Sequence, residues 1–264
     1  MTLRALVINL DDSTERLAAA RASLAAAGFE LERLPAADMR GRPPTAAADY
    51  DDSGARGYMG RSLRGGEVGC YLSHLEAARR IAQDRAPFGL VFEDDVAAAP
   101  GSAQAVAEVL RWLERSARDW DMVHLGANKM KYFTPLHRLS AFGPGVAAHD
   151  LVAAHYFPMT TSALLWSRAG AARFVAGWSR IRMPVDNALR EGMTRSGRGY
   201  AVWPPLAWQS GAASDIDGAT TRRKIGGRTW NYGYLKQRRL MVNKTIALRH
   251  QLAEAARRKD RDPA

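Results

Sequence analysis

Three consecutive carboxylates follow an apolar run: Leu90-Val91-Phe92 is followed directly by Glu93, Asp94 and Asp95. Acidic side chains seldom end a buried strand unless a partner holds them. Like charges in a row raise one another's pKa unless they share a cation, and Mg²⁺ and Mn²⁺ prefer carboxylate oxygens. Because ligands of open α/β sheets bind beyond the carboxyl ends of the strands, the tripeptide indicates a metal-dependent site. Asp-Asp is also good turn chemistry, and the triplet alone does not separate the two interpretations.

The elements around this triplet predict an α/β fold. Residues 6–9 read as a buried strand, 14–27 as a helix and 29–31 as a second strand, and such a β-α-β opening is typical of a parallel sheet. Two stretches, 35–66 and 127–160, are rich in turn-forming or irregular sequence and are predicted to be loops. Further strands are expected at 88–92, 122–125, 163–166 and 200–203, and further helices at 67–83, 103–115, 168–178 and 185–191.

Composition excludes several classes of protein. The chain has 264 residues, enough for one α/β domain with a sizeable core. Its single cysteine, Cys70, allows neither an internal disulfide nor a multi-cysteine zinc site, and it is expected to be a small buried side chain. The glycine pairs 65–66 and 226–227 form neither a dinucleotide-binding fingerprint nor a P-loop, which argues against a dinucleotide oxidoreductase or a P-loop kinase.

The positive charge lies at one end of the chain. Residues 222–264 hold 13 Lys and Arg against 3 Asp and Glu, a net charge of +10, whereas 1–221 hold 25 against 24. We therefore predict a globular domain over 1–221 and a basic helical extension over 222–264, with the boundary near 218–228. The extension suits an acidic partner, either an anionic membrane surface or a phosphorylated acceptor, and a solvated basic helix is the structural alternative. Its few aromatic residues make nucleic acid unlikely as a partner.

The hydropathy of the sequence predicts the cellular localisation of the protein. No apolar run is long enough to cross a bilayer, and the apolar segment at 3–10 is too short for a signal peptide. The expected localisation is cytoplasmic, with peripheral attachment at the inner face of the membrane through the basic extension.

Several segments together resemble glycosyltransferase family 25, which includes lipooligosaccharide and collagen galactosyltransferases. The resemblance covers about 1–217 and is most specific in the pairing of the 66–74 segment Gly-Glu-Val-Gly-Cys-Tyr-Leu-Ser-His with Glu93-Asp94-Asp95. The family's opening motif commonly has a second basic residue where this chain has Asp12 and Ser13. The other segments that carry the resemblance are 7–10 with Glu15-Arg16, 91–96 around the triplet, 121–126, 161–172, 184–186 and 205–216.

The resemblance implies a GT-A type fold, Rossmann-like, with a mostly parallel sheet flanked by helices. It also implies the transfer of a hexose from a UDP-sugar with inversion at the anomeric carbon, and galactose is the first candidate for that hexose. The expected acceptor is a hydroxyl of a lipooligosaccharide, of another cell-envelope glycan or of a lipid-linked acceptor. The cofactor would be Mn²⁺ or Mg²⁺, because a divalent ion stabilises the charge that develops on the leaving diphosphate.

The same resemblance assigns the metal site. Asp95 is expected to bind the ion directly, and Glu93 to reach it through water or to contact the donor ribose. Asp215 is a candidate to complete the metal shell. Asp94 is placed either toward the sugar, in a catalytic role, or in a supporting network.

Four residues are expected around the donor nucleotide. His74 and Ser73 are assigned to the diphosphate, Arg16 to the same group and Asn9 to the nucleotide. Each has a structural alternative: a buried core histidine, a capping serine, a surface arginine and an Asx turn, respectively.

An inverting transfer needs a base that takes the acceptor hydroxyl proton. Asp186, after Pro184 at an expected helix start, is the candidate, with Asp215 as a second. An aspartate at that position is also an ordinary helix cap.

Two other functions compete with the transferase. One is a non-catalytic module that binds anionic glycan or membrane. The other is a sugar-nucleotidyltransferase, which usually has a glycine-rich basic loop where this chain has Asn9 followed by Leu10-Asp11-Asp12.

Overall fold

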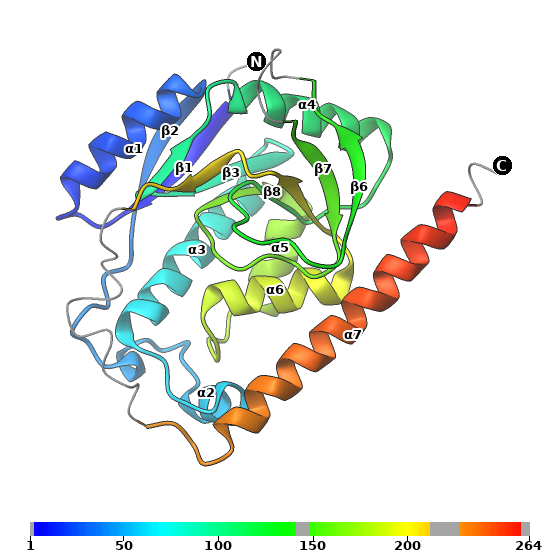
Figure 1. Ribbon diagram of the computed structural model, residues 1–264. Coiled ribbons are helices and arrows are strands. Elements are labelled where there is room, and N and C mark those ends of the chain that lie inside the picture. The colour runs from blue at the N-terminus through cyan, green and yellow to red at the C-terminus, as the bar shows by residue number, and fades with distance from the viewer. Residues whose placement is uncertain (1–2, 141–147, 212–226, 260–264) are drawn as a thin grey trace.

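The computed structural model describes residues 3–140, 148–211 and 227–259. Its centre is an eight-stranded sheet in the order β2-β1-β3-β8-β5-β9-β7-β6 (Figure 1). The strands are β1 (Leu3–Asn9), β2 (Phe29–Pro35), β3 (Phe88–Glu93), β5 (Met122–His124), β6 (Phe133–Arg138), β7 (Asp150–Ala154), β8 (Ala163–Ser167) and β9 (Gly199–Trp203). A separate antiparallel pair joins β4 (Val96–Ala98) to β10 (Ala207–Gln209).

The strand directions confirm the predicted mostly parallel sheet. β1 runs parallel to β2 and β3, and β5 runs parallel to β9. β8 is antiparallel to β3 and β5, and β7 is antiparallel to β9 and β6. Only β7 and β8 therefore oppose the common direction, so six of the eight strands share it.

Helices cover both faces of the sheet, as the α/β prediction requires. The helices are α1 (Thr14–Ala26), α2 (Asp52–Met59), α3 (Gly65–Gln83), α4 (Ser102–Arg115), α5 (Arg168–Gly177), α6 (Val185–Ser196) and α7 (Tyr232–Lys259). Because side chains alternate along a strand, Ile8 and Val91 point into the core beneath α3, α5 and α6, whereas Val7 and Phe92 point into the core beneath α1 and α4.

Two predicted loops contain regular structure. The stretch 35–66 includes a short 3₁₀ turn at Pro44–Ala46 and α2. The stretch 127–160 includes β6 and β7, which pair at the edge of the sheet. The loop prediction failed at β7 because residues 151–154 are all buried, so the strand lacks the alternation of apolar and polar residues that marks a half-buried strand.

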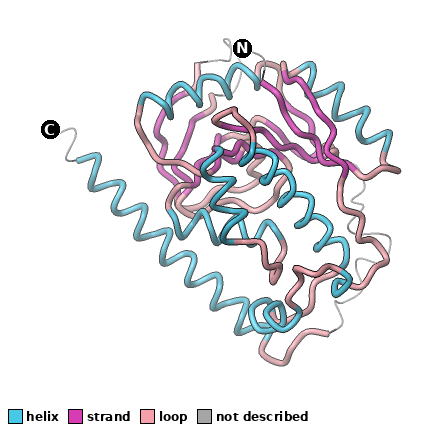
Figure 2. Tube along the Cα trace, turned by 180° about the vertical axis from the view of Figure 1, so that it is seen from behind, coloured by secondary structure: helices cyan, strands magenta, loops and turns pink. Residues whose placement is uncertain are grey.

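The C-terminal extension is helical, as predicted. α7 is 28 residues long and runs along the outside of the molecule, against α2, α6 and β6 (Figures 1 and 2). The predicted boundary between 1–221 and 222–264 lies outside the described residues and stays a prediction. Among the described helices, none combines the length and the apolar character needed to cross a membrane.

A buried carboxylate joins the start of β5 to α5 and β9. The Asp121 side chain is 3% exposed and accepts hydrogen bonds from Nε of Arg173 and Nε of Arg198, each at 2.9 Å. Breaking a buried ion pair from one side costs about 3–5 kcal/mol, and the partial exposure of both arginines reduces this. We expect Asp121→Asn to lower the free energy of unfolding by about 2 kcal/mol, measured by urea denaturation.

Asp119 supplies the matched control, because its exposed carboxylate lies 3.5 Å from Arg173 and 3.7 Å from Arg198. Asp119→Asn should change the free energy of unfolding by less than about 0.5 kcal/mol. Equal losses in the two variants would contradict the role given to burial.

Candidate functional site

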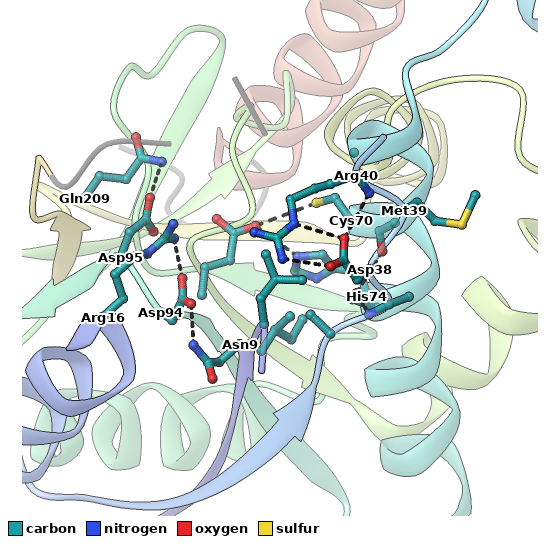
Figure 3. A pocket seen from close by; sticks show the side chains of 18 residues that line it. Asn9, Arg16, Asp38, Met39, Arg40, Cys70, His74, Asp94, Asp95 and Gln209 are labelled. Carbon is teal, nitrogen blue, oxygen red and sulfur yellow. Dashed lines mark hydrogen bonds and ion pairs between the residues drawn. The ribbon is translucent and has the colours of Figure 1, made fainter. Parts of the chain in front are cut away.

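A cleft lies at the carboxyl ends of β1 and β3. It is walled by the end of β1, the loop 36–40 after β2, the first turns of α3 and the acidic triplet. Figure 3 shows Asp94 and Asp95 on one side of this cleft and Cys70 and His74 of α3 on the other. This is the edge of the sheet at which the sequence predicted a ligand site.

Asp94 and Asp95 form the turn between β3 and β4, so the turn interpretation of the triplet is also correct. Asp94 is buried, accepts a hydrogen bond from Nδ2 of Asn9 at 2.7 Å and forms an ion pair with Arg16. Arg33 in turn donates to Oδ1 of Asn9 at 2.9 Å. The geometry therefore favours the second of the two roles considered for Asp94, a supporting network that fixes the ends of β1 and β3 and engages Asn9 and Arg16.

Glu93 is held from two other elements. Its Oε1 accepts the hydroxyl of Thr161 at 2.6 Å and Nε2 of His74 at 3.1 Å. Burial raises the pKa of Glu93, but the hydrogen bonds from His74 and Thr161 outweigh it and keep the pKa below its ordinary value. Since a carboxylate only accepts, Nε2 of His74 carries the proton, and Nδ1 is buried without a hydrogen-bond partner among the described residues.

Asp95 is the incompletely satisfied member of the triplet. Its Oδ2 accepts a hydrogen bond from Nε2 of Gln209 at 3.3 Å, whereas Oδ1 is buried and has no hydrogen-bond partner in the part of the chain that the structure describes. Burial and the neighbouring charge of Glu93 raise the pKa of Asp95 to about 6. A buried carboxylate oxygen without a donor, beside two more carboxylates, fits a bound cation.

A second set of possible ligands overlaps this site. One ligand atom each of Cys70, His74 and Glu93 lies within 4.8 Å of the others. Burial raises the pKa of the Cys70 thiol well above its ordinary value, which keeps the sulfur protonated and neutral. A neutral thiol is a poor ligand for Mn²⁺ or Mg²⁺, so the oxygens of Asp95 and Glu93 suit those ions better.

Ser73 is engaged within the protein. Its hydroxyl donates to the carbonyl of Gly69 at 2.8 Å and accepts the amide of Ala37 at 2.9 Å. The side chain is buried and ties α3 to the loop after β2. This geometry gives Ser73 a structural part in shaping the cleft and leaves its predicted diphosphate contact unsupported.

Asp186 stands at the start of α6, as predicted, and accepts hydrogen bonds from the amide and Nδ2 of Asn187 at 2.7 and 2.9 Å. Burial raises its pKa. α6 packs against α3, and the charge of Asp186 helps to raise the pKa of Cys70 on α3. Asp186 is not among the described residues that line the cleft. Asp215 lies outside the described residues.

The side chains of the site that the sequence interpretation missed include Thr161, Gln209 and Arg40. Arg40 lines the cleft and pairs with Asp38 and Asp12, each at 2.7 Å. Thr161 could have been found if the strand order had been known. It precedes β8, and β8 is antiparallel to β3, so the start of β8 lies beside the end of β3. Nothing local in the sequence marks Gln209 or Arg40.

His124 holds the backbone next to Thr161 through a hydrogen bond to Thr160. Its Nδ1 accepts the amide of Gly126 at 3.1 Å, so Nε2 carries the proton and donates to the carbonyl of Thr160 at 3.0 Å. Burial lowers the pKa of His124 to about 4, so the ring stays neutral at pH 7. Thr160 has a left-handed φ of +78°, a strained conformation that the contact with His124 helps to hold.

Comparison with known proteins identifies the family whose sequence pattern this chain matches. Residues 2–189 match the sequence model described as glycosyltransferase family 25 (LPS biosynthesis protein). Procollagen galactosyltransferase 1-A of Xenopus laevis is 32% identical over 142 residues, which are 53% of this chain and 21% of that protein. The human inactive glycosyltransferase 25 family member 3 is 34% identical over 134 residues, which are 50% of this chain and 21% of that protein.

This chain thus spans about a fifth of the length of these curated relatives. Among solved structures, the glycosyltransferase GlyE of Streptococcus pneumoniae TIGR4 is 10% identical with a TM-score of 0.42, covering 94% of this chain and 63% of that one. So distant a likeness carries no argument about the reaction. The family match, which extends over most of the sequence, shows that the chain belongs to glycosyltransferase family 25.

Proposed function

We propose that this chain is a metal-dependent, inverting hexosyltransferase that uses a UDP-sugar, with galactose as the first candidate. The observation that carries the proposal is the buried Oδ1 of Asp95, without a hydrogen-bond partner among the described residues, at the carboxyl end of β3. Two of the comparisons support it: the family description refers to LPS biosynthesis, and the matched Xenopus relative is a procollagen galactosyltransferase. The proposed acceptor is a hydroxyl of lipooligosaccharide or another envelope glycan.

In this proposal Asp95 and Glu93 would hold the ion. A bound Mn²⁺ or Mg²⁺ supplies Lewis-acid stabilisation of the charge that develops on the leaving diphosphate. His74 and Thr161 keep Glu93 ionised and oriented, since both donate to its Oε1. The network of Asn9, Arg16 and Asp94 fixes the strand ends against which the nucleotide would bind.

The proton balance requires a base on the acceptor side. As the acceptor hydroxyl attacks the anomeric carbon, its proton would pass to the carboxylate of Asp186 while the glycosidic bond to the diphosphate breaks. Hydrogen bonds from Asn187 orient that carboxylate at the start of α6.

A donor screen tests the proposal. UDP-galactose, UDP-glucose and UDP-N-acetylglucosamine, with GDP- and CMP-sugars for comparison, are each added to the protein with Mn²⁺ or with EDTA. Slow metal-dependent hydrolysis of one UDP-sugar, together with a rise in Tm, is the expected result. Absence of any response to every nucleotide sugar would refute the proposal.

One observation favours a second candidate function, a non-catalytic binding module. The matched human relative is named inactive, at an identity similar to that of the Xenopus galactosyltransferase. The module predicts glycan binding that EDTA leaves unchanged and no turnover of any donor.

Thr161 should control metal affinity, because it donates the shortest of the hydrogen bonds that hold Oε1 of Glu93. Groups that orient a metal ligand typically contribute about 10- to 100-fold in affinity. We expect Thr161→Val to weaken Mn²⁺ binding by about 10-fold or more, and Thr161→Ser, which keeps the hydroxyl, to restore most of it. Electron paramagnetic resonance of Mn²⁺ titrated into the donor-free protein measures both. Equal affinities in the two variants would exclude this role.

The partner proposed for the basic extension is an anionic membrane surface, reached by peripheral attachment at the inner, cytoplasmic face. The net charge of +10 over residues 222–264 supports this part of the proposal.

A further inference from the structure

We infer that α7 binds anionic lipid through one particular face, which carries an exposed apolar stripe. The stripe consists of Tyr234, Met241, Leu248 and Leu252, which are 68%, 67%, 45% and 62% exposed. Spacings of seven, seven and four residues place these side chains on one face of a helix. Four large apolar groups in a row along one helix face form a patch of the kind that marks an interaction surface.

The stripe takes no part in folding the helix onto the body. Buried Asn243, Ala247 and Glu254 lie on the opposite face of α7, and the helix packs against α2, α6 and β6. Figures 1 and 2 show the helix along the outer edge of the molecule, so its outward face is accessible. Trp230, two residues before the helix, is 97% exposed and is a further exposed apolar side chain near the N-terminal end of α7.

The charges around the stripe select its partner. On the helical wheel, Arg238 and Arg249 lie on one side of it and Lys244 on the other. The one acidic residue of 232–257 is Glu254, which is buried and accepts a hydrogen bond from Arg118 at 2.6 Å. A basic rim without acidic neighbours would repel a second copy of itself, whereas it complements anionic headgroups while the apolar side chains enter the acyl boundary.

This inference rests on the membrane part of the proposed function and names the surface that performs it. The test needs neither donor nor metal, so its failure is distinct from failure of the transferase proposal. The full chain is sedimented with phosphatidylcholine vesicles containing 30% phosphatidylglycerol and with phosphatidylcholine vesicles alone. Light scattering after gel filtration reports the oligomeric state.

Two variants and one matched control separate the contributions. Met241→Ser/Leu248→Ser/Leu252→Ser removes the stripe, and Arg238→Ala/Arg249→Ala removes one basic rim. Arg21→Ala/Arg111→Ala takes the same charge from exposed positions on α1 and α4. Each α7 variant should weaken binding to the anionic vesicles by about tenfold or more, and the control should change it less than about threefold.

The vesicle-binding results of the variants either support or overturn the inference. Loss of binding in both α7 variants but not in the control supports the inference. No binding to anionic vesicles, or equal weakening in the charge control, overturns it. A dimer that the stripe variant dissociates, with vesicle binding unchanged, would overturn it in favour of a second copy of this chain.

Discussion

Asp95→Asn should lower nucleotide-sugar turnover by about 10³-fold or more, since a bound metal contributes several kcal/mol to the transition state. The same variant should lose Mn²⁺ binding, because Oδ1 of Asp95 is the buried carboxylate oxygen that lacks a donor among the described residues. An amide keeps the shape of the side chain but carries no charge and presents an N–H group. Turnover is followed by release of the nucleoside diphosphate, and Mn²⁺ binding by electron paramagnetic resonance.

Stability distinguishes this effect from misfolding. The pKa of Asp95 is raised to about 6 in the folded protein, mainly by burial. A raised carboxyl pKa means that the folded state binds the proton more tightly than the unfolded state does, so ionised Asp95 reduces stability at neutral pH. Asp95→Asn removes that cost, and the metal-free variant should have a Tm at or above that of the parent protein.

The neighbouring carboxylate provides the control. Asp94→Asn takes the charged partner from Arg16 and should lower the Tm, because Asp94 is buried and its carboxylate belongs to the structural network with Asn9. Unchanged Mn²⁺ affinity in Asp95→Asn would remove Asp95 from the metal site, whatever the activity.

The sequence located the acidic triplet because an unusual pattern, apolar residues followed by three acids, coincides with a general rule about where α/β sheets bind ligands. The 66–74 segment added His74, which the structure places 3.1 Å from Glu93. The prediction for the triplet depends on local sequence, which can be read from one chain. His74 was assigned to the site through the family resemblance, because its position alone fits a buried core histidine equally well.

The remainder of the site depends on long-range pairing. Thr161 reaches Glu93 because β8 lies antiparallel beside β3, and Gln209 reaches Asp95 because β10 pairs with β4. No local pattern fixes those neighbours. Ser73 shows the converse: its position in the motif suggested a ligand contact, but the helix carbonyl of Gly69 and the amide of Ala37 already use its hydroxyl.

The prediction of a loop over 127–160 failed for a related reason. β7 is buried on both faces, and its partner β6 contains Pro135 and a register shift between Pro135 and His137. Proline and irregular pairing are typical of edge strands, and they hide the period of two on which sequence interpretation relies. The central strands β1, β3 and β8 lie among strong helix and turn signals, and these were predicted correctly.

Asp186→Asn should lower kcat by about 10²- to 10⁴-fold while leaving Mn²⁺ affinity unchanged, which is the contribution expected of a general base. Burial raises the pKa of Asp186 above the ordinary value of a carboxyl group. A base acts in its ionised form, so kcat should rise with pH through that raised pKa and level off above it. The residual activity of Asp186→Asn should lack this acidic limb.

Glu191 on the same helix is the matched control for Asp186. Burial also raises its pKa, but its carboxylate pairs with Arg195 at 3.0 Å within α6 and has no part in the proposed mechanism. Glu191→Gln should therefore keep kcat within about threefold of the parent and retain the acidic limb. Equal losses in the two variants would attribute the effect to the stability of α6. Full activity in Asp186→Asn would assign the proton to another group, and Asp215, the second carboxylate considered for this role, would be the next residue to substitute.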